Sequence, residues 1–284
     1  MVFQPTRKRF GQHWLRSDKV LRNIVVAAAV TPQDCVLEIG PGTGILTQSL
    51  LPQAQAVVAV EIDRDLCRQL TQTFAKTPNF RLVQGDFLGV EPSALAFPAP
   101  HDNPAEPWRS WPNKVVANIP YYITGPILEK LLGTIANPNP HPYDSIILLV
   151  QKEVAERLYA KPGNRSFGAL SVRVQYLADC ELVCPVPAKA FQPPPKVDSA
   201  VVKLTPRPLS VVANQPDALD RLVRLGFASK RKMLRNNLKS TVDRDHLLAT
   251  MTDLAIPETS RAEDLSVDQW VALSNRLGQG LAQD

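Results

Sequence analysis

Short apolar runs alternate with amphipathic stretches along the first half of the chain. The apolar runs are rich in Val, Ile, Leu and Ala and cover residues 35–40, 56–63, 80–88, 114–120 and 144–151. Their nearly continuous hydrophobicity is typical of parallel strands buried on both faces. Stretches with helical periodicity precede and separate them, at residues 18–30, 43–51, 64–76, 126–135 and 152–159. This alternation predicts a doubly wound, Rossmann-like α/β sheet.

The pattern changes in the second half of the chain. Residues 170–187 and 199–205 read as strands with little helix between them, and we expect them to form an antiparallel edge of the same sheet. Pro206 and Pro208 mark a boundary, beyond which the pattern is helical to the end. We therefore expect two domains. Residues 1–206 form the α/β domain with a basic N-terminal arm, and residues 207–284 form a smaller, all-helical domain.

Composition and charge narrow the possible functions. The chain has 284 residues, of which 44% are hydrophobic, so global disorder is excluded. No run approaches the roughly 18 to 20 apolar residues of a membrane span. No secretory hydrophobic core follows the basic residues at the N-terminus, and we expect a cytoplasmic protein. The four histidines are scattered and the four cysteines form no CxxC pair, so no metal site is predicted.

The basic residues gather in two segments, although the net charge is only +5. Residues 1–24 hold six Lys or Arg and one acid, and residues 221–240 hold seven and none. Such clusters are typical of surfaces that bind polyanions, nucleic acid above all. Two merely solvated basic helices would give the same pattern, so charge alone leaves both interpretations open.

A glycine-rich loop joins the first predicted strand to the next helix. Residues 38–44 read Glu-Ile-Gly-Pro-Gly-Thr-Gly, and Gly40 and Gly42 would let a ligand approach the backbone closely. The third glycine of the dinucleotide fingerprint would fall at Ile45, and Pro41 lacks the N–H that a phosphate would use. A cofactor without phosphate fits this loop better than NAD does, and S-adenosylmethionine is the common one.

Two acids end the following strands. Glu61, 21 residues after Gly40, can accept hydrogen bonds from both hydroxyls of a ribose. Asp86 ends the third strand and can accept from the amine of an adenine. A surface acid before a helix and a turn-capping acid are the structural alternatives. Carboxyl ends of parallel strands meet at one edge of a sheet, so we expect the loop and both acids to share one site.

Residues 118–121, Asn-Ile-Pro-Tyr, follow the fourth strand and suit methyl transfer to an aromatic amine. Such an amine is a poor nucleophile because its lone pair is delocalised into the ring. The Asn118 side-chain oxygen and a backbone carbonyl can accept hydrogen bonds from it and direct the lone pair to the methyl group. Pro120 stiffens the turn, and Tyr121 can stack on the target base. The alternative is a strand-ending turn with a core tyrosine.

With these motifs in place, the chain resembles the KsgA/RsmA family, the adenine dimethyltransferases of small-subunit rRNA, over nearly its whole length. The matching blocks are residues 9–15 (RFGQHWL), 38–44, 61–63, 85–86, 118–121, 162–171 (PGNRSFGALS), 191–199 (FQPPPKVDS) and 231–238 (RKMLRNNL). The resemblance implies a class I S-adenosylmethionine-dependent methyltransferase fold. It also implies dimethylation of the N6 amines of two adjacent adenines in the 3′-terminal hairpin loop of 16S rRNA, as part of ribosome biogenesis.

The resemblance assigns further residues. It implies that His13 and Leu15 line the cofactor pocket together with Gly40, Glu61, Asp86 and Asn118. It also implies that Phe191 joins Tyr121 in sandwiching the flipped adenine. The substrate would be a pre-small-subunit particle, and the helical domain would dock on its rRNA backbone. We assign that docking to Lys230, Arg231, Lys232 and Arg235. We expect a monomer, since no dimerisation segment is evident.

The chain departs from the family pattern in three places. Trp14 stands where Phe is usual, Tyr122 stands where Asn often follows the motif, and the proline-rich loop at 98–112 is longer than usual. Two other enzymes share the chemistry: the large-subunit rRNA adenine methyltransferase of macrolide resistance, and a DNA adenine methyltransferase. The second would need a target-recognition domain, for which we see no candidate. A ribosome-assembly checkpoint or another binding factor on the same fold is the non-enzymatic alternative.

Overall fold

The computed structural model describes residues 13–98, 109–208 and 211–281. It forms two compact units. The first contains the described residues up to Leu131, from His141 to Ala155 and from Glu181 to Pro206, and the second contains the rest. The chain passes from the first unit to the second after Pro206, where a domain boundary is predicted. The second unit also takes residues 132–140 and 156–180, which the prediction places in the α/β domain. The basic arm before residue 13 and most of the 98–112 loop lie outside the described residues.

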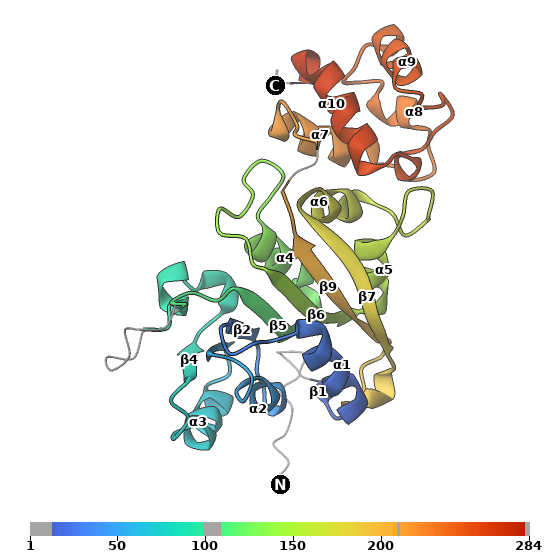
Figure 1. The fold of residues 1–284 in the computed structure, drawn as a ribbon. Coiled ribbons are helices and arrows are strands. Elements are labelled where there is room, and N and C mark those ends of the chain that lie inside the picture. The colour runs from blue at the N-terminus through green and yellow to red at the C-terminus, as the bar shows by residue number, and fades with distance from the viewer. Residues whose placement is uncertain (1–12, 99–108, 209–210, 282–284) are drawn as a thin grey trace. The chain divides into compact units, whose positions relative to one another are not determined.

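A seven-stranded sheet forms most of the first unit. Its strands are β2 (Cys35–Ile39), β3 (Ala56–Glu61), β4 (Phe80–Gln84), β5 (Lys114–Asn118), β6 (Ser145–Gln151), β7 (Ala178–Val186) and β9 (Ser199–Pro206). They lie in the order β4-β3-β2-β5-β6-β9-β7, with β7 and β9 side by side (Figure 1). The pairs from β4 to β6 are parallel, and β9 runs antiparallel to β6. The parallel sheet and its antiparallel neighbour β9 are confirmed.

The strand order creates a switch point beside β2. From β2 the chain adds β3 and β4 on one side, then returns to add β5 and β6 on the other. Crossover connections therefore leave β2 and β5 in opposite directions and open a crevice at their carboxyl ends. Every residue of β2 and β3 is buried, as expected for strands covered on both faces.

Five helices connect the strands of this region: α1 (Asp18–Ala28), α2 (Ile45–Leu50), α3 (Arg64–Thr73), α4 (Thr124–Leu132) and α5 (Lys152–Tyr159). The predicted cap of α1 is confirmed, because the Ser17 hydroxyl accepts a hydrogen bond from the Val20 amide at 3.4 Å. Val20, Ile24 and Ala28 recur every four residues, so they share one buried face of α1. That face packs into the main hydrophobic core, which fixes the segment just before α1 against the sheet.

Residues 170–177 do not form a strand, and this part of the prediction is wrong. They belong to helix α6 (Ala169–Leu177), and β7 begins only at Ala178. The Ser171 hydroxyl accepts from the Gly168 amide at 2.9 Å and closes the first turn of the helix. The Gln175 amide donates to the carbonyls of Leu158 and Ala160, both at 2.8 Å. These tertiary contacts outweigh the β propensity of a valine-rich segment.

The C-terminal part of the chain is helical within residues 211–281, as predicted. Its helices are α7 (Pro216–Gly226), α8 (Leu234–Leu238), α9 (Arg244–Asp253) and α10 (Val267–Leu281), with a 3-10 turn, η6 (Ala262–Asp264). Trp270 of α10 is fully buried, and its ring lies 5.6 Å from that of Phe227. A Cβ atom on Gly226 would collide with the Trp270 ring, so a glycine is needed where α7 approaches α10.

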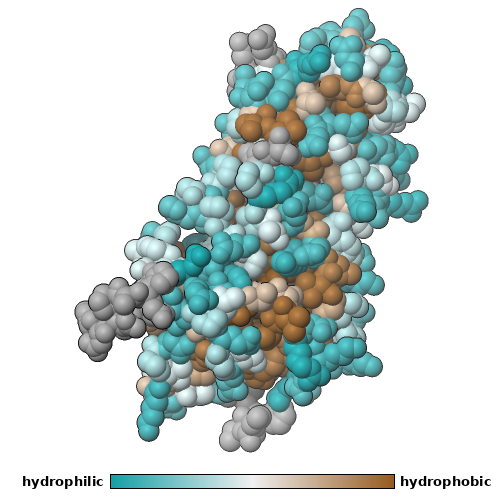
Figure 2. Space-filling view, viewed as in Figure 1, coloured by the Kyte–Doolittle hydropathy of each residue, from teal (hydrophilic) through white to brown (hydrophobic). Residues whose placement is uncertain are grey.

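Some apolar side chains remain exposed on the first unit. Val26 of α1 and Leu182 of β7 are 77% and 44% exposed. Figure 2 shows hydrophobic patches among hydrophilic surface on the face that carries these two elements. Such scattered apolar exposure is ordinary for a folded domain. None of the helices that the structure describes has the length and apolar character needed to cross a membrane.

Candidate active site

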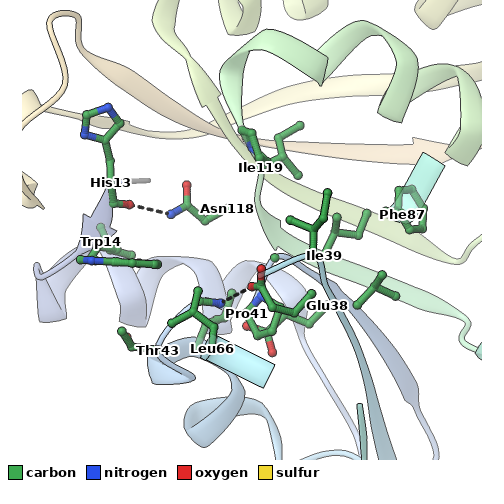
Figure 3. A pocket seen from close by; sticks show the side chains of 18 of the residues that line it. His13, Trp14, Glu38, Ile39, Pro41, Thr43, Leu66, Phe87, Asn118 and Ile119 are labelled. Carbon is green, nitrogen blue, oxygen red and sulfur yellow. Dashed lines mark hydrogen bonds between the residues drawn. The ribbon is translucent and has the colours of Figure 1, made fainter. Parts of the chain in front are cut away.

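A pocket lies at the carboxyl ends of β2, β3, β4 and β5, entirely within the first unit (Figure 3). All seven residues predicted to bind the cofactor line it: His13, Leu15, Gly40, Gly42, Glu61, Asp86 and Asn118. Pro120 and Tyr121 of the predicted catalytic motif line it as well. Among the described residues that line it, the acidic side chains are those of Glu38, Glu61 and Asp86, and none is Lys or Arg. A cationic ligand therefore suits the pocket better than a phosphate does.

The glycine loop forms the floor of the pocket. Gly40 and Gly42 have φ angles of +68° and +59°, which side-chain-bearing residues rarely adopt. A Cβ atom on Gly42 would lie 2.6 Å from Cζ3 of Trp14, so the indole ring is packed directly against the loop. Trp14 lies flat beside Thr43 and Pro41 in Figure 3. The loop thus needs glycine both for its backbone conformation and for this close contact.

Glu61 holds the glycine loop while keeping acceptor capacity. Its side chain is buried, with Oε2 accepting from the Gly42 amide at 3.2 Å and Oε1 from the Asp63 amide at 2.9 Å. Burial raises the pKa of Glu61, although these two hydrogen bonds oppose the shift. Each carboxylate oxygen has a second lone pair, so both can still accept from a pair of ribose hydroxyls.

Asp86 has two roles that the sequence analysis treats as alternatives. It follows β4, and its Oδ1 accepts from the Leu88 amide at 3.0 Å, which caps the 3-10 turn η2 (Phe87–Gly89). The same exposed side chain lines the pocket. Capping fixes one oxygen and leaves the other to accept from a ligand amine.

Glu38 is a pocket residue that the sequence analysis does not assign. It is 1% exposed, and the Thr47 hydroxyl donates to its Oε2 at 2.6 Å. Burial raises the pKa of Glu38 to about 8, and the neighbouring carboxylate of Glu61 adds to the shift. The group is therefore protonated at neutral pH. The sequence feature that could have identified Glu38 is its position as the only acid in the apolar run at residues 35–40.

The catalytic motif begins at the last residue of β5. Asn118 Nδ2 donates to the His13 carbonyl at 3.4 Å, a contact drawn in Figure 3. Because the amide nitrogen is engaged there, Oδ1 is directed away from His13 and remains an acceptor. Pro120 precedes the 3-10 turn η4 (Tyr121–Ile123), with φ −61°. The side-chain oxygen that the predicted chemistry requires is therefore available.

The Tyr121 side chain has two contacts, one through its ring and one through its hydroxyl group. Its ring lies 6.2 Å from the His13 ring, at an interplanar angle of 18°. Its hydroxyl lies 2.6 Å from the Ser199 hydroxyl. Burial raises the pKa of Tyr121, so the phenol is neutral near pH 7 and cannot serve as a general base. A neutral, fixed aromatic ring suits stacking rather than proton transfer.

A two-stranded ribbon attaches the segment before α1 to the segment before β9. Strand β1 (Trp14–Leu15) pairs antiparallel with β8 (Phe191–Gln192). The Nδ1 atom of His13 lies 2.8 Å from the Pro193 carbonyl oxygen. A carbonyl only accepts, so Nδ1 carries the proton in this contact. The ribbon thereby sets the position of the His13 carbonyl that engages Asn118.

Phe191 is placed differently from the other predicted site residues. Its side chain is 3% exposed and belongs to the hydrophobic core cluster that includes Ile24 and Val186. It is not among the residues that line the pocket. The structure therefore does not bring the Phe191 ring together with Tyr121 at the pocket surface, and its stacking on a target base stays a prediction.

The predicted RNA-binding cations belong to the second unit and fall into two groups. The side chains of Arg231 and Lys232 are exposed and have no ion-pair or hydrogen-bond partner among the described residues. Lys230 donates to the Arg165 carbonyl at 3.0 Å, and Arg235 lies 3.1 Å from a Glu258 carboxylate oxygen. The first two are available for a polyanion, whereas the other two also serve local structure.

No group of three or more His, Cys, Asp or Glu able to hold a metal ion occurs within the described part of the chain. The named pocket residues can act through hydrogen bonds, charge and stacking.

Comparisons with known proteins agree with the geometry. The model of a family described as ribosomal RNA adenine dimethylase matches residues 4–279. A protein of Nostoc sp. named ribosomal RNA small subunit methyltransferase A is 61% identical over 272 residues, covering 96% of this chain and 98% of its own.

Two solved structures have the same fold. A dimethyladenosine transferase from Plasmodium falciparum has a TM-score of 0.77 at 28% identity, over 94% of this chain and 98% of its own. The 23S rRNA methyltransferase ErmE has a TM-score of 0.71 at 28% identity, over 94% of this chain and all of its own. The fold is thus that of class I S-adenosylmethionine-dependent methyltransferases.

Proposed function

The chain belongs to the ribosomal RNA adenine dimethylase family, and from this premise we propose the reaction that its pocket performs. It transfers methyl groups from S-adenosylmethionine to the N6 amines of two adjacent adenines in the 3′-terminal hairpin loop of 16S rRNA. The observation that carries the proposal is Oδ1 of Asn118, which has no hydrogen-bond partner among the described residues and lines the same acidic pocket as Tyr121.

The residues present fit S-adenosylmethionine, which supplies an electrophilic methyl group on a positively charged sulfur. Glu61 offers acceptors for the ribose hydroxyls, and Asp86 offers one for the adenine amine. The carboxylates of Glu61 and Asp86 in the described lining stabilise a cationic cofactor. His13 and Leu15 close the side of the pocket next to the β1–β8 ribbon.

The chemistry of the motif follows from these positions. Asn118 Oδ1 and a backbone carbonyl of the motif accept hydrogen bonds from the N6–H groups, which localises the nitrogen lone pair and directs it at the methyl group. Tyr121 stacks on the flipped base and fixes its plane. The N6 proton becomes acidic only once the methyl is transferred, so positioning and electrostatics dominate and no strong base is required.

We assign rRNA docking to the second unit. Arg231 and Lys232 are exposed cations, which bind phosphates without reading sequence. The Lys230 contact places the loop that carries the exposed Lys161 and Arg165 beside them, so these two extend the same basic surface. The partner we propose is the pre-small-subunit particle, bound by a monomer. The relative from Nostoc sp. is bacterial, and ribosome assembly places this activity in the cytoplasm.

Methyl transfer from radiolabelled S-adenosylmethionine tests the proposal. Small ribosomal subunits that lack the modification are the substrate, and large subunits are the parallel control. We expect label in the small subunit, recovered as N6,N6-dimethyladenine. Label in large-subunit RNA instead would assign the chain to the activity named for ErmE, whose fold it shares. Label in neither would support the binding-factor alternative.

The same assay separates catalysis from an assembly role. Asn118→Ala removes the proposed acceptor and leaves the basic surface intact. If that variant still restores assembly in cells lacking the enzyme, binding to the particle matters more than methylation does. The intact Asn118–Tyr121 geometry favours catalysis as the main activity.

A further inference from the structure

Ser199 is a buried polar residue that the proposed mechanism does not use. It is the first residue of β9, is 0% exposed and pairs with Gln151 at the carboxyl end of β6. The three residues after it in β9, Ala200 to Val202, are buried and apolar. Burying a hydroxyl costs free energy unless it is hydrogen-bonded, so a serine in such a position calls for a partner.

Its partner is the proposed base-stacking residue. The two hydroxyl oxygens of Ser199 and Tyr121 lie 2.6 Å apart, a short distance for two neutral hydroxyls. The contact joins the start of β9 to the turn after β5, across 78 residues of sequence. Tyr121 is thus held at the end of its side chain by the rigid sheet rather than by its own loop.

The main chain of Tyr121 is held as well. The Thr124 hydroxyl donates to the Tyr121 carbonyl at 3.1 Å, and Pro120 fixes the preceding backbone. With backbone and tip both anchored, rotation about χ1 would move the Tyr121 hydroxyl away from Ser199 and break the bond. The ring therefore loses its rotamer freedom on folding, before any base arrives.

We propose that Ser199 is a positioning residue that pre-orients Tyr121 for stacking on the target adenine. This inference rests on the proposed function, because it assumes that Tyr121 contacts the base. Ser199 itself touches no substrate in this scheme. Its hydroxyl fixes the direction in which the Tyr121 ring extends from the turn after β5, so its removal lowers the rate of transfer rather than cofactor binding.

A double-mutant cycle tests the proposal in the full-length protein. Ser199→Ala and Tyr121→Phe each remove one hydroxyl and keep the ring. We expect each to lower kcat about three- to tenfold, the reduction typical of removing one neutral hydrogen bond. We expect the double variant to lie within about twofold of the weaker single variant, because both changes break the same bond. Cofactor affinity, measured by calorimetry, should stay within about twofold of wild type.

Ser145→Ala is the matched control. Ser145 is also a buried serine at the first position of a strand, but it lies at the amino end of β6, opposite the pocket. We expect its kcat to equal that of wild type. Additive reductions in the cycle, or an unchanged kcat in Tyr121→Phe, would overturn the proposal. If Ser199→Ala fails to fold, the kcat of Tyr121→Phe alone tests the proposal.

Failure of this inference can be distinguished from failure of the proposed function. The cycle is run on whichever ribosomal subunit the wild-type protein methylates. A wild type without activity on either subunit refutes the proposed function, and with it the premise of this inference. An active wild type with additive variants refutes the positioning role of Ser199 alone.

Discussion

The pocket and the basic surface that we propose for rRNA carry opposite charges and are built in opposite ways. In the pocket, the Glu61 carboxylate is buried and tied by hydrogen bonds to Gly42 and Asp63. On the second unit, the side chains of Arg231 and Lys232 are exposed and have no partner among the described residues. A small ligand of fixed shape favours groups held in place before it binds. A long polyanion is held by mobile cations, and binding is driven by the release of counterions.

The largest expected effect separates chemistry from both kinds of recognition. Asn118→Ala removes the acceptor for the amine, and we expect kcat to fall by about 100-fold or more, by analogy with the removal of one preorganised group in other active sites. Cofactor affinity should fall much less than kcat, although Asn118 also lines the cofactor pocket, and particle affinity should change by less than about threefold. Single-turnover methylation with parallel binding measurements checks this. Equal reductions in all three would assign Asn118 to the fold.

Glu61→Ala tests whether the buried carboxylate recognises the cofactor. The variant removes two ribose hydrogen bonds and the anchor of the glycine loop together, so we expect cofactor affinity to weaken more than about tenfold. Calorimetry on the free enzyme measures it. Glu91→Gln, at an exposed acid outside the pocket lining, is the control and should bind as wild type does. Unchanged affinity in Glu61→Ala would remove it from the site.

The basic surface should respond to salt, because its cations act through charge. In Arg231→Gln/Lys232→Gln we expect weaker particle binding, and a slope of log Kd against log salt reduced by about 0.7 to 0.9 for each phosphate that the variant no longer neutralises. Lys76→Gln, an exposed cation of the first unit, is the control. A wild-type slope in the double variant would exclude these residues from the interface.

The same salt titrations test whether the predicted cations contribute unequally to particle binding. Arg235 is paired with Glu258, so Arg235→Gln should change the salt slope less than Arg231→Gln does. Equal changes would show that the ion pair opens when the particle binds. Filter binding at several salt concentrations distinguishes the two outcomes.

A pH dependence is the effect expected on stability rather than on activity or binding. Burial raises the pKa of Glu38 to about 8 from an ordinary value of 4.5. Between these values the folded state keeps a proton that the unfolded state has released, so rising pH lowers stability, and the decrease is complete above pH 8. Glu38→Gln cannot ionise and should lack this contribution. Urea unfolding of both proteins at pH 5.5 and 8 measures the difference, and parallel pH profiles would contradict it.

Features set by local pattern were predictable, and those set by distant contacts were not. The apolar runs predicted the parallel strands, and the glycine loop, Glu61, Asp86 and Asn118 came together because strand ends share an edge. The helix at residues 169–177 was missed because its contacts to Leu158 and Ala160 are tertiary.

The positions of the Asn118, Tyr121 and Phe191 side chains could not be predicted from the sequence either. The bond from Asn118 to His13 spans 105 residues, and that from Tyr121 to Ser199 spans 78. No local pattern encodes either. Phe191 precedes a proline-rich turn, a setting that does not distinguish a stacking ring from a core ring. Its packing in the core depends on α1 and β7, whose positions a local pattern around residue 191 does not specify.

The β1–β8 ribbon has a consequence for how the protein is made. One wall of the pocket is assembled from residues 180 positions apart, as the contact between His13 and Pro193 shows. A growing chain that has not yet emerged past β8 has its glycine loop and Asn118 but lacks the strand that seats His13 and Leu15. The nascent protein therefore completes this wall only after residues 191–192 of β8 have left the ribosome, long after the glycine loop and Asn118.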